Sequence, residues 1–400
     1  MNKNMYRQIG VLAGSQAIFQ TASVLVATIG GLAGGQLAPS ADYATLPVAT
    51  MFLGTAVMTF PASLWMSKVG RKRGFCAGTV AGIVGGISGA MGLITSSFFL
   101  LCFGTFLVGV YQAFAQFYRF AASEVATPAF RPKAISLVMA GGIVAALAGP
   151  LLAQLGSNLS AVPYAGSFAL LIVISLVGLL TLTRLKKDEP VSTQMNAISG
   201  RPWHTVISQP AYLIALFGAA TGYGIMILAM TATPLAMMHH DHPLAETSIV
   251  IQLHVLGMFL PSFFTGRLIE RFGVISIMLT GILFFIVHIL LTLTGTGFAS
   301  FAGALIFVGL GWNFLYIGGT TLVTTTFSSA EKGVAQAVND MTIFVVGLAC
   351  SLCAAALLSS IGWEKMNLML LPWLAVTTLT LLWLAMRRRK LALTRDAAVK

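Results

Sequence analysis

The stretch RLKKDEPVSTQMNAISGRPWH, residues 184–204, decides how this sequence is organised. It is the longest polar interruption in a 400-residue chain that is 57% hydrophobic and only 8% charged. A typical soluble domain carries about 25% charged residues, so this much apolar surface requires a lipid environment. The interruption predicts a six-helix bundle over residues 1–184, a cytoplasmic linker over 185–206, and a second six-helix bundle with a short basic cytoplasmic tail over 207–400.

Each half holds six apolar segments long enough to cross a bilayer, for which about 20 residues are needed. The twelve segments are residues 8–35, 43–66, 74–96, 98–122, 132–158, 162–183, 207–236, 245–268, 273–294, 297–325, 333–358 and 366–386. The sequence therefore predicts an all-α membrane protein with twelve transmembrane helices in two six-helix halves.

The basic residues test this topology, because cytoplasmic loops are rich in Lys and Arg. With both termini in the cytoplasm, every second loop is basic, and only Arg119 and Lys365 fall outside the cytoplasmic set. The net charge of +12 thus reflects membrane topology. The basic residues are spread over separate loops, which argues against a nucleic-acid partner. The predicted partner is therefore the lipid bilayer.

Two loops echo each other across the halves. SLWMSKVGRKRG begins at Ser63 and GRLIERFGVISI begins at Gly266. In each loop a glycine follows a basic residue by two positions, and each loop comes after the second helix of its half. The echo indicates an internal repeat.

Both loops resemble the G-x-x-x-D-R-x-G-R-K loop of the major facilitator superfamily, which helps to latch the two halves on the cytoplasmic side. The first loop matches the end of this motif at Gly70, Arg71 and Lys72, but has Ser63 for the glycine and Ser67 for the aspartate. The missing carboxylate predicts a weak latch in the first half, and a plain basic anchor is the alternative.

The second loop departs less from the motif. It keeps the first glycine, an acid at Glu270, a basic residue at Arg271 and the last glycine at Gly273. The resemblance implies the superfamily's fold and a gating role for Gly70, Arg71, Glu270 and Arg271.

Helices seven and eight carry the strongest candidate site. Met226 and Met230 lie four residues apart, as do His254 and Met258, and residues at that spacing share one helix face. Counted from the outer helix ends, the two pairs lie at matching depths of roughly 12 and 18 Å. If both helices face one cavity, three thioethers and one imidazole converge near the bilayer midplane.

Thioethers select copper(I) and imidazole also suits copper, whereas magnesium and calcium require oxygen ligands. Transporters bind substrate near the midplane, often beside broken helices, and Pro234 and Pro261 lie close to the two pairs. The set therefore predicts copper as the transported substrate, with no permanently bound cofactor. Simple packing is the alternative, because a chain with 18 methionines contains such pairs by chance.

The outer end of helix seven is rich in further soft ligands. The segment MMHHDH predicts a region that collects metal and passes it inward, with an exposed polar turn as the alternative. Its candidate ligands are Met237, Met238, His239, His240 and His242. His288, in helix nine, is interpreted as a lone buried histidine.

The paired motifs MILAM, residues 226–230, and HVLGM, residues 254–258, resemble those of the CcoA-type copper importers within the superfamily. Three further stretches resemble the same branch and are shared with relatives that carry organic solutes such as riboflavin. They are QFYRFAA at 116–122, MAGGIVAALAGP at 139–150 and GWNFLYIGGTTLVT at 311–324.

This resemblance spans essentially the whole chain. It implies a bacterial cytoplasmic (inner) membrane protein that imports copper by alternating access for assembly of the cbb-type haem–copper oxidase. The predicted partners are then the copper ion, the bilayer and a copper chaperone in the cytoplasm or periplasm.

Two other functions remain open from the sequence. A carrier of a small organic solute, such as a riboflavin-like compound or a drug, would use four aromatic residues to line its cavity, and a metal sensor would bind copper without moving it. These aromatic residues are Tyr111, Tyr118, Trp312 and Tyr316. No G-x-x-x-x-G-K-[ST] loop is present, so a gradient is the predicted energy source. No nucleophile–base or acid–base pair indicates an enzyme.

Three charged residues are candidates for coupling or gating. Arg119 lies within helix four, where a charge is costly and needs a partner. Glu124 lies near the inner end of that helix, and Arg131 in the next loop is its expected partner. Asp340 lies about two turns into helix eleven. A purely structural role is the alternative for each.

Overall fold

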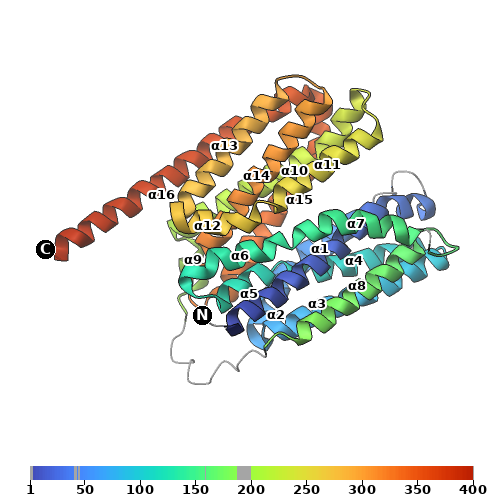
Figure 1. Cartoon of the computed structure of the whole chain (residues 1–400), viewed down its shortest axis with the longest axis horizontal. Helices are drawn as coiled ribbons and strands as arrows, with labels where there is room; N and C mark the ends of the chain where they lie inside the picture. The colour runs from blue at the N-terminus through green and yellow to red at the C-terminus, as the bar shows by residue number, and fades with distance from the viewer. Residues whose placement is uncertain (1–2, 40–42, 44–45, 158, 187–199, 400) are drawn as a thin grey trace. The chain divides into compact units, whose positions relative to one another are not determined.

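The computed structural model describes residues 3–39, 43, 46–157, 159–186 and 200–399, and all regular secondary structure in these ranges is helical (Figure 1). Within them, twelve helices are long and apolar enough to cross a membrane. The predicted all-α, twelve-span fold is therefore confirmed. Residues 187–199, most of the predicted linker, lie outside the described residues.

The chain forms two compact units. Unit 1 comprises Met1–Phe130, Leu137–Ser199 and Lys332–Met341, and unit 2 comprises Arg131–Ser136, Gly200–Glu331 and Thr342–Lys400. Two helices thus divide their residues between the units, one after Ser136 and the other after Met341. They are α6 (Arg131–Ala140) and α15 (Lys332–Leu368).

Unit 1 is built mainly from the first half of the chain. Its other helices are α1 (Lys3–Leu37), α2 (Leu46–Val69), α3 (Arg71–Ile94), α4 (Phe98–Ala115), α5 (Tyr118–Val125), the 3-10 turn η2 (Pro128–Phe130), α7 (Gly142–Ser157) and α8 (Ala165–Thr183). Helix α4 packs along both α2 and α3. A Cβ on Gly54 of α2 would lie 2.2 Å from the Phe106 carbonyl oxygen of α4, so this contact requires a residue without a side chain.

Unit 2 is organised around one central helix. Its other helices are α9 (Trp203–Ile207), α10 (Pro210–His239), α11 (Leu244–Phe259), α12 (Ser262–Phe272), α13 (Val274–Thr292), α14 (Phe298–Val323) and α16 (Leu370–Val399). Helix α14 packs extensively against α10, α11 and α13, and its residues from Gly311 to Val323 are all buried. Side chains on α14 therefore contact most of the unit's interior.

The eighth predicted span is broken between α11 and α12, next to Pro261. Asn313 of α14 donates from its amide to the Met258 carbonyl and to the Ser262 hydroxyl, each at 2.6 Å. One buried side chain thus holds both sides of the break. Pro234, by contrast, lies inside the continuous helix α10.

Two further spans are broken at positions with no proline beside the break. The fourth span divides into α4 and α5 at Gln116 and Phe117, and the fifth divides into α6 and α7 at Gly141. At the first break, the Arg119 guanidinium donates to the Gln116 carbonyl oxygen at 2.8 Å. The side chain satisfies a backbone group at the interruption, which stabilises it inside the membrane-spanning segment.

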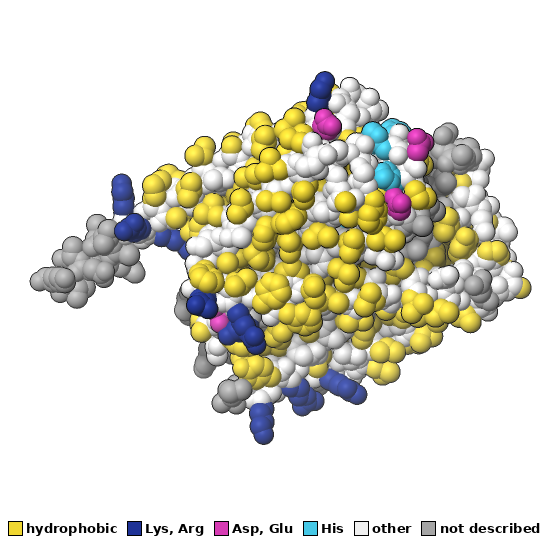
Figure 2. Space-filling model, turned by 45° about the horizontal axis from the view of Figure 1, so that its top comes forward, with side chains coloured by type: hydrophobic (Ala, Val, Ile, Leu, Met, Phe, Trp, Pro, Cys, Tyr) yellow, Lys and Arg dark blue, Asp and Glu magenta, His cyan; other side chains and the backbone are white. Residues whose placement is uncertain are grey.

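Apolar side chains dominate the visible surface of the protein, and histidines gather with acidic side chains in one patch (Figure 2). The large exposed residues include Leu and Phe side chains on many of the spanning helices. Such a surface is expected for helices in contact with lipid.

Candidate functional site

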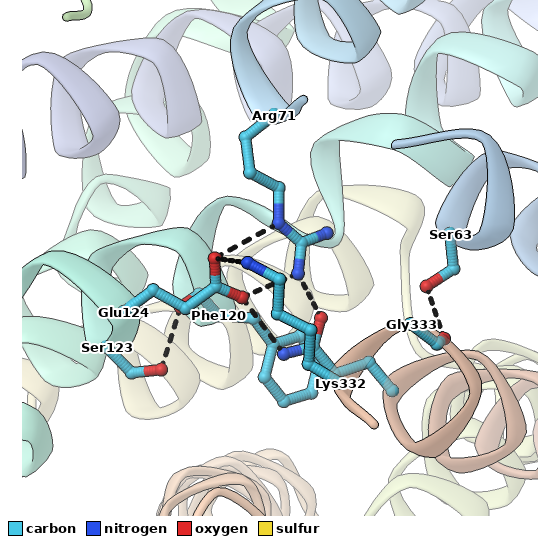
Figure 3. A network of polar contacts seen from close by, with 8 residues as sticks. Ser63, Arg71, Phe120, Ser123, Glu124, Lys332 and Gly333 are labelled. Carbon is cyan, nitrogen blue, oxygen red and sulfur yellow. Dashed lines mark hydrogen bonds and ion pairs between the residues drawn. The ribbon is translucent and has the colours of Figure 1, made fainter. Parts of the chain in front are cut away.

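The first polar cluster of unit 1 surrounds Glu124 at the end of α5 (Figure 3). Arg71 contacts the two carboxylate oxygens of Glu124 at 2.6 and 3.3 Å, and Lys332 lies 2.9 Å from Oε2. Gln336 donates to Glu124 Oε1 at 3.2 Å and accepts a hydrogen bond from Arg71. The carboxylate is therefore surrounded by donors from α3 and α15.

This cluster corrects one expectation from the sequence. Glu124 pairs with Arg71 and Lys332, whereas the sequence suggested Arg131. It also supplies a carboxylate to the first loop motif, although the motif's own aspartate position is Ser67. This acid lies 53 residues beyond Arg71, outside the loop motif, and the weak latch of the first half stays a prediction.

The second polar contact of unit 1 is a buried ion pair. Arg119 Nη2 lies 2.5 Å from Asp340 Oδ1, and the two side chains are 2% and 0% exposed. Both residues were candidates from the sequence, and the predicted need of Arg119 for a partner is confirmed. Their pairing was not predicted, because 221 residues separate them.

The motif glycines adopt the conformation that only glycine takes readily. Gly70 has φ 97° and ψ 157°, and Gly273 has φ 82° and ψ 152°. Each immediately precedes a spanning helix. The internal echo in the sequence thus corresponds to the same backbone turn in both units.

In each unit a small residue allows two helices to pack closely, α12 against α6 in unit 2 and α2 against α15 in unit 1. The small residue belongs to the loop motif in unit 2 but to the partner helix in unit 1. In unit 2, a Cβ on the motif glycine Gly266 would lie 2.6 Å from Lys133 Cα of α6. In unit 1 the motif position is Ser63, whose hydroxyl donates to the Gly333 carbonyl of α15 at 2.8 Å. A Cβ on Gly333 would lie 2.9 Å from Ser67 Cβ, so here the partner helix provides the glycine.

The remaining gating candidates lie on α12. Glu270 forms an ion pair with Lys133 at 2.5 Å, with both side chains partly exposed. Arg271 lies over the Phe272 ring at 5.3 Å from its centroid. The Lys133–Glu270 ion pair ties α12 to the start of α6 within unit 2.

The Met/His residues lie in the interior of unit 2. His254 is fully buried, Met226 and Met258 are 3% and 8% exposed, and Met230 is half-buried. The α11 backbone at His254 and Met258 packs against Gly309 of α14. Helices α10 and α11 both pack mainly on α14. That the three methionines and His254 converge on one ion stays a prediction.

The hydrogen bond of His254 fixes its tautomer. Its Nδ1 lies 2.9 Å from the Leu305 carbonyl, which accepts only, so Nδ1 carries the hydrogen. In the neutral ring Nε2 then offers a lone pair, and this atom is buried with no partner among the described residues. His288 differs, because both its nitrogens are bonded, to Ala304 O and Asn367 Oδ1, in agreement with its interpretation as a lone buried histidine.

The predicted metal-collecting segment is partly helical. Met237 to His239 form the last turn of α10, with Met237 buried and Met238 65% exposed. His239 and His240 are exposed. His242 lies 2.7 Å from both Glu246 Oε2 and the Thr296 carbonyl, so its two nitrogens are already engaged. Among the described residues, no group of three or more His, Cys, Asp or Glu side chains is placed to hold a metal.

A chain of aromatic rings runs through unit 2 from α11 to α15. Trp312 and Tyr316 stack at 4.9 Å and 16°, and Phe259 meets the Trp312 ring edge-on at 5.6 Å. Tyr223 of α10 lies 6.0 Å from Tyr316 and 5.5 Å from Phe344. The Trp312 indole nitrogen is buried without a partner among the described residues.

The other two aromatic candidates, Tyr111 and Tyr118, are buried in unit 1. Tyr111 packs edge-on against Phe19, and Tyr118 against Phe75 at 4.6 Å. Sequence reasoning had named Tyr111, Tyr118, Trp312 and Tyr316, but it missed Tyr223, Phe259 and Phe344. Nothing in their local sequence distinguishes them from packing residues.

Comparison with known proteins places these features in context. The family model described as the Major Facilitator Superfamily matches residues 12–251 and 214–399. The riboflavin transporter RfnT of Brucella anthropi is 38% identical over 379 residues, covering 94% of this chain and 95% of that protein. The uncharacterized MFS-type transporter YdeG of Bacillus subtilis is 27% identical over 87% of this chain and 85% of its own length.

Solved structures support the same fold. The Escherichia coli fucose:proton symporter FucP superposes with a TM-score of 0.76, at 14% identity, over 94% of this chain and 98% of that chain. A bacterial homologue of the iron transporter ferroportin gives a TM-score of 0.72 at 14% identity, over 94% and 98% of the two chains. At such identities the likeness concerns the fold alone.

Proposed function

Because the chain belongs to the major facilitator superfamily and is a secondary active transporter, we propose that its solute is a planar aromatic compound of the riboflavin class. The bacterial cytoplasmic membrane is the proposed location. The observation that carries this proposal is the stacked Trp312–Tyr316 pair, with its unpartnered indole N–H.

The aromatic chain suits such a solute chemically. A flavin ring is flat and apolar on its faces, and it carries carbonyl and N–H groups at its edge. Aromatic side chains bind flat rings by offset stacking, worth about 0.5–1.5 kcal/mol per pair beyond area burial. The Trp312 N–H is a donor for a ring carbonyl, and a few such polar groups orient a ligand in an apolar site.

The relative RfnT supports the same solute class, since its likeness covers 94% of this chain at 38% identity. The stretch GWNFLYIGG, which includes Trp312 and Tyr316, is one of those that resemble solute carriers. The organic-solute alternative from the sequence thus becomes the leading proposal, ahead of copper import.

Copper import is the second candidate, and one observation favours it. His254 presents a buried lone pair at Nε2 while Nδ1 is held by a backbone carbonyl. Metal-binding imidazoles are commonly oriented in this way through their second nitrogen. In this candidate Met226, Met230, His254 and Met258 bind copper as cargo, and a copper chaperone receives or supplies it for oxidase assembly.

The experiment that separates them uses purified protein in liposomes. Uptake of labelled riboflavin is measured against excess unlabelled riboflavin and against copper(I), and uptake of labelled copper is measured in the same preparation. The proposal expects saturable riboflavin uptake that copper does not inhibit. Saturable copper uptake with no riboflavin uptake would overturn it in favour of the second candidate. Copper binding without accumulation would indicate a sensor.

A further inference from the structure

Helices α11 and α14 lie side by side in unit 2, and each carries a buried polar atom that has no partner among the described residues (Figure 1). On α11 this atom is His254 Nε2, and on α14 it is the Trp312 indole nitrogen. Buried polar atoms are nearly always hydrogen-bonded, so each exception requires an explanation. Two exceptions on one pair of helices point to a common ligand.

The two atoms have opposite hydrogen-bonding character. The indole nitrogen of Trp312 is a donor only. The Nδ1–H of His254 donates to the Leu305 carbonyl at 2.9 Å, so in the neutral ring Nε2 is an acceptor. A ligand that satisfies both atoms therefore needs one acceptor group and one donor group.

Contacts along the helix pair show how far apart the two residues lie. His254 meets α14 at Leu305, and Phe259 meets the Trp312 ring edge-on at 5.6 Å. Between these contacts the α11 backbone packs closely on Gly309. Leu305 and Trp312 are separated by about 10 Å of helix rise. This separation is comparable to the extent of a flavin ring together with its hydroxylated side chain.

A second buried histidine of unit 2 provides the contrast. Both ring nitrogens of His288 are bonded, to the Ala304 carbonyl and to Asn367 Oδ1. The fold thus satisfies one buried imidazole completely, as expected of a residue that serves packing. His254 is equally buried but has only its Nδ1 bonded within the described residues, which indicates that a bound molecule completes its contacts.

We infer that His254 Nε2 accepts a hydrogen bond from a donor group of the transported solute, and that His254 thereby determines which solutes are accepted. The inference rests on the proposed riboflavin-class function, in which Trp312 donates to a ring carbonyl. Riboflavin carries two kinds of donor, the hydroxyl groups of its side chain and the imide N–H of its ring. The site then favours flat ring compounds that combine a carbonyl group with such a donor.

The unmet state of Nε2 makes this contact selective. A solute donor that reaches Nε2 satisfies it without displacing another partner in the described part of the chain. An analogue without that donor loses the bond, at a cost of roughly tenfold in affinity. Sites that hydrogen-bond a polar substrate group discriminate in this way against analogues that lack the group.

The test measures how well two analogues compete with labelled riboflavin for uptake into the same liposomes. Lumiflavin has a methyl group in place of the hydroxylated side chain and keeps the imide N–H. Riboflavin methylated at its imide nitrogen keeps the hydroxyls and lacks that N–H. With wild type we expect at least one analogue to compete roughly tenfold less well than unlabelled riboflavin. The weaker analogue identifies which donor His254 binds.

His254→Leu removes the acceptor. Its affinity for riboflavin should fall roughly tenfold, while its affinity for the weaker analogue stays the same, so that the preference disappears. His254→Gln keeps an acceptor oxygen near the position of Nε2 and should retain part of the preference. His204→Leu, at an exposed histidine of α9, is the matched control and should keep all of it. An undiminished preference in His254→Leu would overturn the inference.

The wild-type measurement does not depend on the folding of any variant, and it separates this inference from the proposed function. Saturable riboflavin uptake that both analogues inhibit as well as riboflavin does would overturn the inference and leave the proposed function intact. If wild type takes up no riboflavin, the proposed function is refuted, and the inference is refuted with it.

Discussion

Gly70 and Gly273 adopt nearly the same positive-φ conformation, at φ 97° and 82°, directly before α3 and α13. One turn therefore reverses the chain between consecutive spanning helices in both units. An L-residue in this region of backbone space is strained by about 1–3 kcal/mol.

Gly273→Ala should therefore destabilise the protein by about 1–3 kcal/mol. A Cβ at Gly273 would meet nothing within 4 Å, so backbone strain is the only cause. The control is Gly297→Ala, where there is also nothing within 4 Å but φ is −77°. Thermal unfolding in detergent compares them, and equal melting temperatures for the two variants would contradict the assignment.

Trp312→Phe should weaken riboflavin transport while keeping the stacked ring. Loss of one hydrogen bond to the solute costs about 1 kcal/mol, a roughly fivefold rise in KM with little change in kcat. Trp203→Phe makes the same change at a side chain that is 58% exposed on α9. An unchanged KM in Trp312→Phe would show that the Trp312 indole N–H does not bind the solute.

His254→Leu tests the copper candidate, because it deletes a buried imidazole whose Nε2 has no partner among the described residues. If copper is the cargo, cellular copper accumulation should fall to the level of cells without the protein, and Met230→Leu should act in the same way. His204→Leu, at an exposed histidine of α9, is the matched control. Normal copper accumulation in His254→Leu, with equal protein in the membrane, would exclude this site.

His242 should make stability depend on pH. The hydrogen bond to the Thr296 carbonyl, and then the contact with Glu246, raises the pKa of His242 above its usual 6.5. Since the folded state favours the protonated ring, the stabilisation is present in full below about pH 6.5 and is lost as pH rises through the raised pKa. Melting temperatures measured between pH 5 and pH 9 should show this loss in wild type and lack it in His242→Gln. The same pH dependence in both proteins would argue against the contact.

Ser67 and Gly333 should show coupled energetics. In wild type, Gly333→Ala places a Cβ 2.9 Å from Ser67 Cβ and should be destabilising by about 1–3 kcal/mol. In a Ser67→Gly background the clash is gone, and alanine is a better helix former than glycine by about 1 kcal/mol. The same change should then be neutral or stabilising. A double-mutant cycle on unfolding free energies measures the difference, and additive effects would show that the crossing is not tight.

The spans were predictable because each is a long apolar run, and the two halves because one polar stretch divides them. The breaks at Gln116 and Gly141 were not, since both depend on contacts with neighbouring helices instead of a proline. Arg119 and Asp340 could be singled out by the expense of a charge within a span. Their pairing required knowing how α15 lies against α5.

The tautomer of His254 likewise could not be derived from sequence, because it depends on which carbonyl of α14 lies opposite. The same holds for the chain of aromatic rings: Trp312 and Tyr316 were named from the sequence as candidates to line a cavity, but Tyr223 was not. Convergence of the methionines and His254 on one ion stays a prediction.

The glycine at the close helix crossing lies on different helices in the two units. In unit 1 it is Gly333 of α15, whose carbonyl accepts from Ser63 at the motif position, and in unit 2 it is the motif glycine Gly266, which lies against Lys133. This difference affects how such sequences should be searched. A sequence pattern that requires glycine at the first motif position rejects the amino-terminal loop, which has Ser63 there. The helices at that loop nevertheless pack closely, because a Cβ on Gly333 would lie 2.9 Å from Ser67 Cβ. The closeness of each crossing depends on the combined bulk of two facing positions, and the small residue lies on α15 in unit 1 but on α12 in unit 2. Scoring those positions as a pair would recognise divergent members that single-site patterns discard.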